Sequence, residues 1–84
     1  MKKINIQLKM FMKFEKYLPP DSVDGKAMIV LEEGKTLEDL INILGIPIDE
    51  PRIVVINGIS HGVANASVLA EGDIVAFFAP VGGG

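Results

Sequence analysis

The sequence has no cysteine and a single histidine among its 84 residues. The missing cysteine excludes disulfides, a thiolate nucleophile and cysteine-ligated zinc, and it fits a reducing cytoplasm, where we expect the protein to be located. One histidine provides no metal-ligand spacing, and His61 stands beside an expected turn, where an ordinary surface role is the simpler interpretation. No phosphate-binding glycine motif precedes a helix. We therefore expect no metal site and no bound cofactor, and we expect that the chain is not an enzyme by itself.

Basic residues are also scarce over most of the chain. Five of the eight Lys and Arg residues lie in the first sixteen positions, and the net charge is −3. No basic stripe with interleaved aromatic residues is present, so nucleic-acid binding is not expected. The acidic remainder is interpreted as a solvated face, with a basic partner as the alternative. Uncharged runs are far shorter than a membrane span, and the N-terminal residues lack the apolar core of a signal peptide.

Apolar residues, in contrast, are abundant for a chain of this size. They make up 49% of the sequence, and the mean hydropathy is +0.38. A chain this short forms one domain and buries only about 60–65% of its unfolded surface. Its small core is not expected to hold all of the apolar side chains. This predicts an exposed apolar patch and a protein partner.

The hydrophobic pattern predicts two strands, one helix and three further strands. Residues 4–14 alternate between apolar and polar side chains, with Phe11 as an exposed exception on the polar side. Residues 27–31 form the expected second strand, and residues 37–44 follow the helical apolar spacing. Further strands are expected at 53–56, at 59–63 after the Asn57-Gly58 turn, and at 74–79.

The ends of the helix carry recognisable signals. Thr36 followed by Asp39 resembles a capping box, in which each residue accepts a hydrogen bond from the other's backbone. Gly45 stands where a helix-terminating glycine belongs, and Pro47 prevents the helix from resuming. A hairpin, a crossing helix and more strands predict a two-layer α+β domain. A β-grasp arrangement satisfies this order, with four to five strands on one helix and the first and last strands parallel in the centre.

The last strand places two phenylalanines next to each other. Side chains alternate between the faces of a strand, so Phe77 and Phe78 cannot both enter a core on one face of the sheet. Phe77 shares the parity of Val75 and is expected inside. Phe78 is expected on the outer face, covered either by a neighbouring loop or by a partner.

The sequence ends in Gly82, Gly83 and Gly84 directly after an apolar segment. Residues without Cβ form a thin thread that enters a narrow cleft where larger side chains would clash. This predicts that the terminal carboxylate is a reactive or recognised group, although short terminal segments are commonly disordered. We expect a domain over residues 1–81 and a flexible tail over residues 82–84.

The residues that close the chain resemble the MoaD/ThiS family of ubiquitin-like sulfur carriers. The resemblance is carried by Glu71–Gly84, by Val55–Gly58, by the capped helix and by the opening strand with Tyr17–Pro20. Ala76–Phe78 before Pro80-Val81 is more similar to the molybdopterin synthase small subunit than to the thiamine carrier. Ala79 replaces a proline common in this motif, and Gly82 adds a third glycine before the usual pair.

The resemblance implies a mechanism. A ubiquitin-activating-type enzyme uses ATP to adenylate the C-terminal glycine, here Gly84, and a persulfide or sulfide displaces AMP to give a thiocarboxylate. That sulfur is then donated, in a synthase large subunit, to a precursor of the molybdenum or tungsten cofactor. Gly82 and Gly83 reach into both partners' active sites, while Phe78, Pro80, Val81 and Phe11 form the partner-binding surface. A thiamine-pathway carrier and a ubiquitin-like protein modifier joined through Gly84 remain alternatives.

Overall fold

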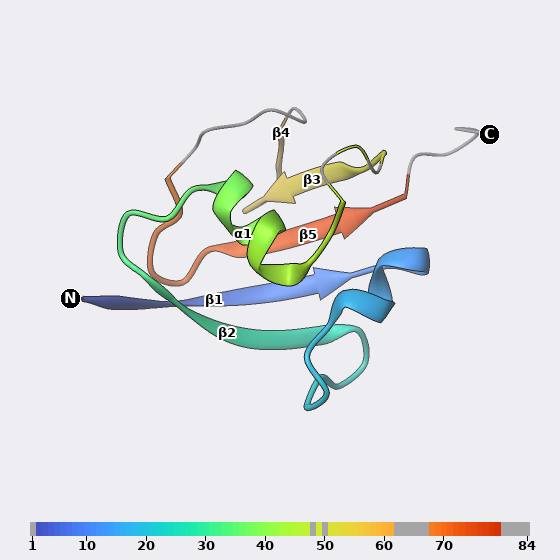
Figure 1. The fold of residues 1–84 in the computed structure, drawn as a ribbon, viewed down its shortest axis with the longest axis horizontal. Helices are drawn as coiled ribbons and strands as arrows, with labels where there is room; N and C mark the ends of the chain where they lie inside the picture. The colour runs from blue at the N-terminus through green and yellow to red at the C-terminus, as the bar shows by residue number, and fades with distance from the viewer. Residues whose placement is uncertain (1, 48, 50, 62–67, 80–84) are drawn as a thin grey trace.

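The computed structural model describes residues 2–47, 49, 51–61 and 68–79, and the side chains of Ser60 and His61 lie outside this description (Figure 1). Five strands, one α-helix and one 3₁₀ helix follow one another along the chain. They are β1 (Lys3–Met10), η1 (Met12–Tyr17), β2 (Lys26–Glu32), α1 (Leu37–Leu44), β3 (Ile53–Ile56), β4 (Ile59–His61) and β5 (Ile74–Phe78). Within the described ranges, neither helix has the length and apolarity needed to span a membrane.

The five strands form one mixed sheet in the order β2-β1-β5-β3-β4. The first and last strands are parallel neighbours, with Gln7 beside Ile74 and Met10 beside Phe77. The other strand pairs are antiparallel. Figure 1 shows α1 crossing one face of this sheet, with η1 at the end toward which β1 and β5 point. The α+β prediction and its β-grasp topology are therefore confirmed.

The core lies between α1 and the sheet face that it covers. Every second residue of β1, β3 and β5 faces inward and packs against the buried face of α1. The core consists of Ile4, Ile6, Leu8, Met10, Phe14, Leu31, Leu37, Leu40, Ile41, Ile46, Val54, Ile56, Leu69, Val75 and Phe77. Phe77 is fully buried and Phe78 is half-buried, as the alternation of the strand requires.

The capping box predicted at Thr36 starts α1. The Thr36 hydroxyl accepts a hydrogen bond from the Asp39 N–H at 3.2 Å, and the Asp39 carboxylate accepts one from the Thr36 N–H at 2.9 Å. The Thr36 hydroxyl also donates to the Asp39 carboxylate at 3.1 Å. The bond from the Thr36 N–H first, and then the bond from the Thr36 hydroxyl, lower the pKa of the Asp39 carboxyl. Gly45 ends the helix with φ +79°, the left-handed conformation that glycine adopts without strain.

The prediction of a strand over residues 4–14 is wrong in its last part. The strand ends at Met10, and the chain enters η1 through Met12, whose φ of +57° is incompatible with a strand. Phe14 still reaches the core because one turn of 3₁₀ helix returns its side chain toward the sheet. Met12, expected inside by parity, is instead 66% exposed. Alternation over so short a stretch does not distinguish a strand from a strand followed by a helical turn.

The Asn57-Gly58 hairpin is confirmed, and it also fixes the start of β5. Both turn residues have positive φ, +52° and +86°, as a type I′ turn needs. The Asn57 side chain donates to the Asp73 carboxylate at 2.9 Å and accepts from the Ile74 N–H at 2.9 Å. The Asp73 carboxylate also accepts from the Ala70 N–H at 2.8 Å. The return strand β4 is shorter than the predicted 59–63 and ends at His61.

Candidate partner-binding site at the end of the last strand

The expected site residues divide into two groups. Phe11 and Phe78 are described by the structure and lie together at the end of β5. Pro80, Val81 and the three glycines Gly82, Gly83 and Gly84 lie outside the described residues, so their predicted roles stay predictions. Ala79, the last residue that the structure describes, packs against the core immediately after Phe78. The expected boundary between the domain and the tail after residue 81 stays a prediction.

Phe11 and Phe78 form a stacked aromatic pair. Their ring centroids are 4.5 Å apart and their planes differ by 5°. The Phe11 N–H donates to the Phe77 carbonyl at 3.2 Å, which continues the pairing of β1 with β5 by one residue and aligns the two rings. Phe11 is 39% exposed, although its ring is stacked. Phe11 therefore covers one face of the Phe78 ring, and the stacked pair faces outward.

Two more apolar side chains extend this pair, and sequence reasoning missed both. Ile53 is the β3 partner of Phe78 in the sheet register and is 39% exposed. Met12 follows Phe11 and is more exposed still. The four residues Phe11, Met12, Ile53 and Phe78 are called the end patch below. The missed signal for Ile53 was the β3–β5 register, which places it on the outer face beside Phe78.

The left-handed backbone of Met12 is the strained point of the end patch. A non-glycine residue with positive φ is uncommon, and such strain is concentrated at functional sites. Here the conformation turns the chain from β1 into η1 and directs a long apolar side chain away from the core. A methionine is well suited to such a surface, because its flexible thioether adapts to differently shaped partners.

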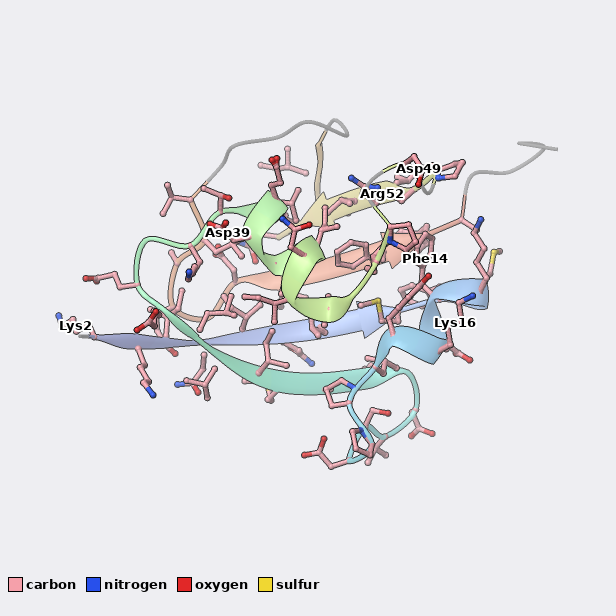
Figure 2. The ribbon with its side chains drawn as sticks, viewed as in Figure 1. Lys2, Phe14, Lys16, Asp39, Asp49 and Arg52 are labelled. Carbon is pink, nitrogen blue, oxygen red and sulfur yellow. The ribbon has the colours of Figure 1, made fainter. Side chains whose placement is uncertain are left out.

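The side chains below the end patch hold it rigidly. Fully buried Phe77 lies 6.0 Å from the ring of Phe14, which is itself fully buried. Adjacent residues of β5 therefore have opposite tasks: Phe77 anchors the strand and Phe78 presents its ring outward. Figure 2 shows Phe14 near the end of β5.

Two lysines of η1 lie at this end of the molecule. Lys13 and Lys16 belong to η1, and their ammonium groups lie 5.7 Å and 5.3 Å from the ring centroids of Phe14 and Tyr17. In Figure 2, Lys16 projects from η1 at the same end of the sheet as the end patch. Cations over aromatic rings are attracted by the negative faces of those rings. The end patch thus lies at the same end of the sheet as two lysines of η1, although the chain as a whole is acidic.

Comparison with known proteins identifies the family. Residues 3–81 match the Mut7-C ubiquitin family. The chain belongs to that family. No curated protein matches the sequence at a significant level. Among solved structures, SAMP1 from Haloferax volcanii is similar with a TM-score of 0.66 and 19% sequence identity, over 95% of this chain and 99% of that chain. At that identity the similarity shows a shared fold, and it confirms that this Mut7-C ubiquitin domain is ubiquitin-like.

Another residue that sequence reasoning missed is Arg52. It is the buried charged residue among those described, with 5% exposure, and it directly precedes Ile53 of the end patch. Figure 2 places Arg52 and Asp49 in the segment that leads into β3. Nothing in the local sequence marks Arg52 as buried, because its burial results from the packing of this segment over the domain.

The chemistry that the end patch supports is binding. Stacked aromatic rings and exposed apolar side chains bury well against a complementary surface. The patch consists of one methionine, one isoleucine and two phenylalanines, none of which transfers a proton or forms a covalent intermediate. Any reaction at this end of the Mut7-C ubiquitin domain must therefore use groups beyond the patch.

Proposed function

We propose that the protein is a ubiquitin-like sulfur carrier that acts through the carboxylate of Gly84 in molybdopterin biosynthesis. One observation carries the proposal: the end patch lies where β5 ends, six residues before Gly84. A partner that docks on the patch would receive the glycine segment in its active site. Membership of a ubiquitin-like family supports the same role.

The proposed reaction starts at a carboxylate, which is a poor electrophile at neutral pH. An activating enzyme would join the Gly84 carboxylate to the α-phosphate of ATP and release pyrophosphate. Hydrosulfide then attacks the acyl carbon, the bond to the phosphate oxygen breaks, and AMP leaves with the electron pair. If the donor is a persulfide, the acyl disulfide formed must be cleaved by a thiol. In either case the product is a thiocarboxylate, and the chain needs no cysteine of its own.

The roles of the remaining expected residues follow from this scheme. Gly82 and Gly83 would pass through a narrow channel, and Pro80 with Val81 would guide the segment from the domain into it. Phe78 and Phe11 would form the centre of the docking surface. The partners would be an adenylating, sulfur-transferring enzyme and a synthase large subunit, and the ATP would be bound by the activating enzyme.

The decisive experiment is mass spectrometry of the intact protein after incubation with its activating enzyme, ATP and a sulfur source. We expect the mass change of one oxygen-to-sulfur exchange, located at Gly84. A variant lacking Gly84 should melt like wild type and gain no sulfur. Gly83→Val should also gain little, because a β-branched side chain thickens and stiffens the thread, and Gly82→Val should be more tolerant. Sulfur transfer by the protein lacking Gly84 would contradict the proposal.

A second function shares the activated intermediate. If a target lysine rather than sulfide attacks the acyl-adenylate, the same chain becomes a protein modifier. Its similarity to SAMP1 is a similarity of fold and does not distinguish the two outcomes. Digestion of total protein from producing cells distinguishes them, because a glycine remnant on target lysines marks the modifier and a terminal thiocarboxylate marks the carrier. A thiamine-pathway carrier would give the same thiocarboxylate with a different synthase partner.

A further inference from the structure

The edge strand β2 has an unusual surface for the outside of a sheet. It is the first strand in the order β2-β1-β5-β3-β4, so one of its sides has no neighbouring strand. Its five central residues, 27–31, carry no charge and no proline. Met28 and Val30 are 60% and 59% exposed on the outer face. Exposed edge strands usually carry charges, prolines or bulges that prevent pairing with another chain, and the centre of β2 has none of these.

The printed hydrogen bonds show which backbone groups face outward along this edge. Glu33 donates to the Lys2 carbonyl and the Gly25 carbonyl accepts from Met10, so odd-numbered residues of β2 face β1. Even-numbered residues therefore face the open side. Lys26 already exchanges two hydrogen bonds there with Val23, at 2.9 Å and 3.0 Å. The segment open to a new strand thus runs from Met28 to Glu32 and is centred on Val30.

We propose that this edge pairs antiparallel with the same edge of a second copy, about a two-fold axis at Val30. A segment from 28 to 32 is symmetric about its middle residue, so each open group of one copy meets an open group of the other. Val30 then lies beside its counterpart, and Met28 lies opposite the second copy's Glu32. The pairing stops at Met28, where Val23 already fills the edge, and at Glu32, where β2 ends.

Charge complementarity favours a second copy as the occupant. In this register Lys26 lies diagonal to the second copy's Glu32, a spacing at which cross-strand side chains interact. Each contact occurs twice by symmetry.

This interface would not compete with the proposed carrier function. A two-fold axis through antiparallel edge strands makes one continuous sheet, in which the two β5 strands point in opposite directions. Both end patches stay open at opposite ends of the dimer. The contact is short, so the dimer should be weak and depend on concentration. Its failure would leave the role of Gly84 untouched, and failure of that role would leave the dimer untouched.

The first test is sedimentation velocity of the full chain from low micromolar to millimolar concentration. We expect a monomer–dimer equilibrium in wild type. Val30→Lys places two like charges face to face at the axis and should weaken dimerisation at least about tenfold. Val68→Lys is the matched control, because Val68 has similar exposure, 64% against 59%, and lies outside β2. A wild type that stays monomeric, or equal weakening by both variants, would overturn the proposal.

A second test keeps the conclusion independent of folding defects. Lys26 lies opposite Lys9 within the sheet, so Lys26→Glu removes a like-charge pair inside the monomer and should not lower its melting temperature. The same change opposes the second copy's Glu32 and should weaken the dimer, and adding Glu32→Lys should restore it. In hydrogen exchange, the amides of Met28, Val30 and Glu32 should gain protection as concentration rises, and concentration-dependent protection at Phe11 and Phe78 instead would contradict this assignment.

Discussion

The two ends of β5 are held by different chemistry. At its start, the side chains of Asn5, Asn57, Glu71 and Asp73, here called the polar end, bond to backbone groups and to one another. At its finish lies the end patch, with its exposed apolar side chains. The same strand thus begins in a network of internal hydrogen bonds and ends in a surface that offers apolar area to a partner.

The difference shows how a small domain combines rigidity with binding. Polar groups at the start of β5 bond to one another within the chain: Glu71 accepts from the Asn5 N–H at 2.9 Å, and the Asn5 carbonyl accepts from the Gly72 N–H at 2.8 Å. Such bonds fix the register of the central strand. The finish is fixed from beneath by Phe77 and Phe14 instead, which leaves the outer side chains available. The strand is therefore fixed at both ends, and at its C-terminal end the outer side chains are available to a partner.

The largest expected effect comes from Phe77, which anchors the open end. Phe77→Ala removes a fully buried ring from between Phe14 and the sheet and should cost about 3–5 kcal/mol of unfolding free energy. Urea denaturation followed by circular dichroism measures the loss. Phe77→Leu is the control and should lose much less, since it keeps most of the apolar volume. A loss below about 1 kcal/mol for the alanine variant would show that the end patch is not held from beneath.

A smaller loss is expected at the polar end. Asn57→Gly keeps the positive φ of the turn but removes the side-chain bonds to Asp73 and to the Ile74 N–H, and it should cost about 1–3 kcal/mol. Asn57→Ala should cost more, because alanine tolerates positive φ less well than glycine. Binding at the end patch should be unchanged in both. If these variants weakened partner binding as much as changes in the patch do, the two ends would not be independent.

Local signals in the sequence predicted the elements that depend on neighbouring residues. The Thr36–Asp39 box, the Gly45 stop and the Asn57-Gly58 turn are each complete within a few positions, and all three are confirmed. The opposite faces of Phe77 and Phe78 followed from strand alternation alone. For such features a short segment contains all of the interactions that decide its conformation.

Features that depend on distant pairing could not be predicted in the same way. Ile53 joins the end patch only because β3 pairs with β5, and the stacking of Phe11 on Phe78 requires β1 on the other side of β5. The change at Met12 from strand to 3₁₀ helix was missed because both conformations satisfy the short apolar alternation. The burial of Arg52 likewise results from tertiary packing. Five of the seven expected site residues, those from Pro80 to Gly84, stay a prediction.

Substitutions in the capping box of α1 serve as a reference, because this box lies at neither end of β5. Thr36→Ala removes the hydroxyl of the capping box and should cost about 1 kcal/mol. The lowered pKa of Asp39 adds a pH dependence. Because its folded pKa lies below the unfolded value of about 3.9, its contribution is present above that pH and is lost as pH falls through the folded pKa.

Thermal melting of wild type and Asp39→Asn as a function of pH tests this sign. The difference in melting temperature should be constant near neutral pH and should shrink as the solution is acidified below about pH 4. A difference that grows with acidification would mean that the carboxylate opposes folding. The difference in melting temperature between wild type and a variant of the end patch should not depend on pH in this way, because the four side chains of the patch do not titrate.

The smallest effect on stability, and the largest on binding, is expected at the end patch itself. Phe78→Ala and Phe11→Ala each remove one ring of a stacked pair that is already partly exposed. A double-mutant cycle with both changes should give a coupling of about 0.5–1 kcal/mol in unfolding free energy, as for other aromatic pairs.

Either single change should weaken binding to the activating enzyme several-fold, because aromatic residues at the centre of an interface contribute most of its energy. Met28→Ala, which alters an exposed apolar residue on β2, is the control and should bind like wild type. Equal loss of binding in all three variants would place the docking surface over the whole outer face of the sheet, and the contrast between the two ends of β5 would then not explain where partners bind.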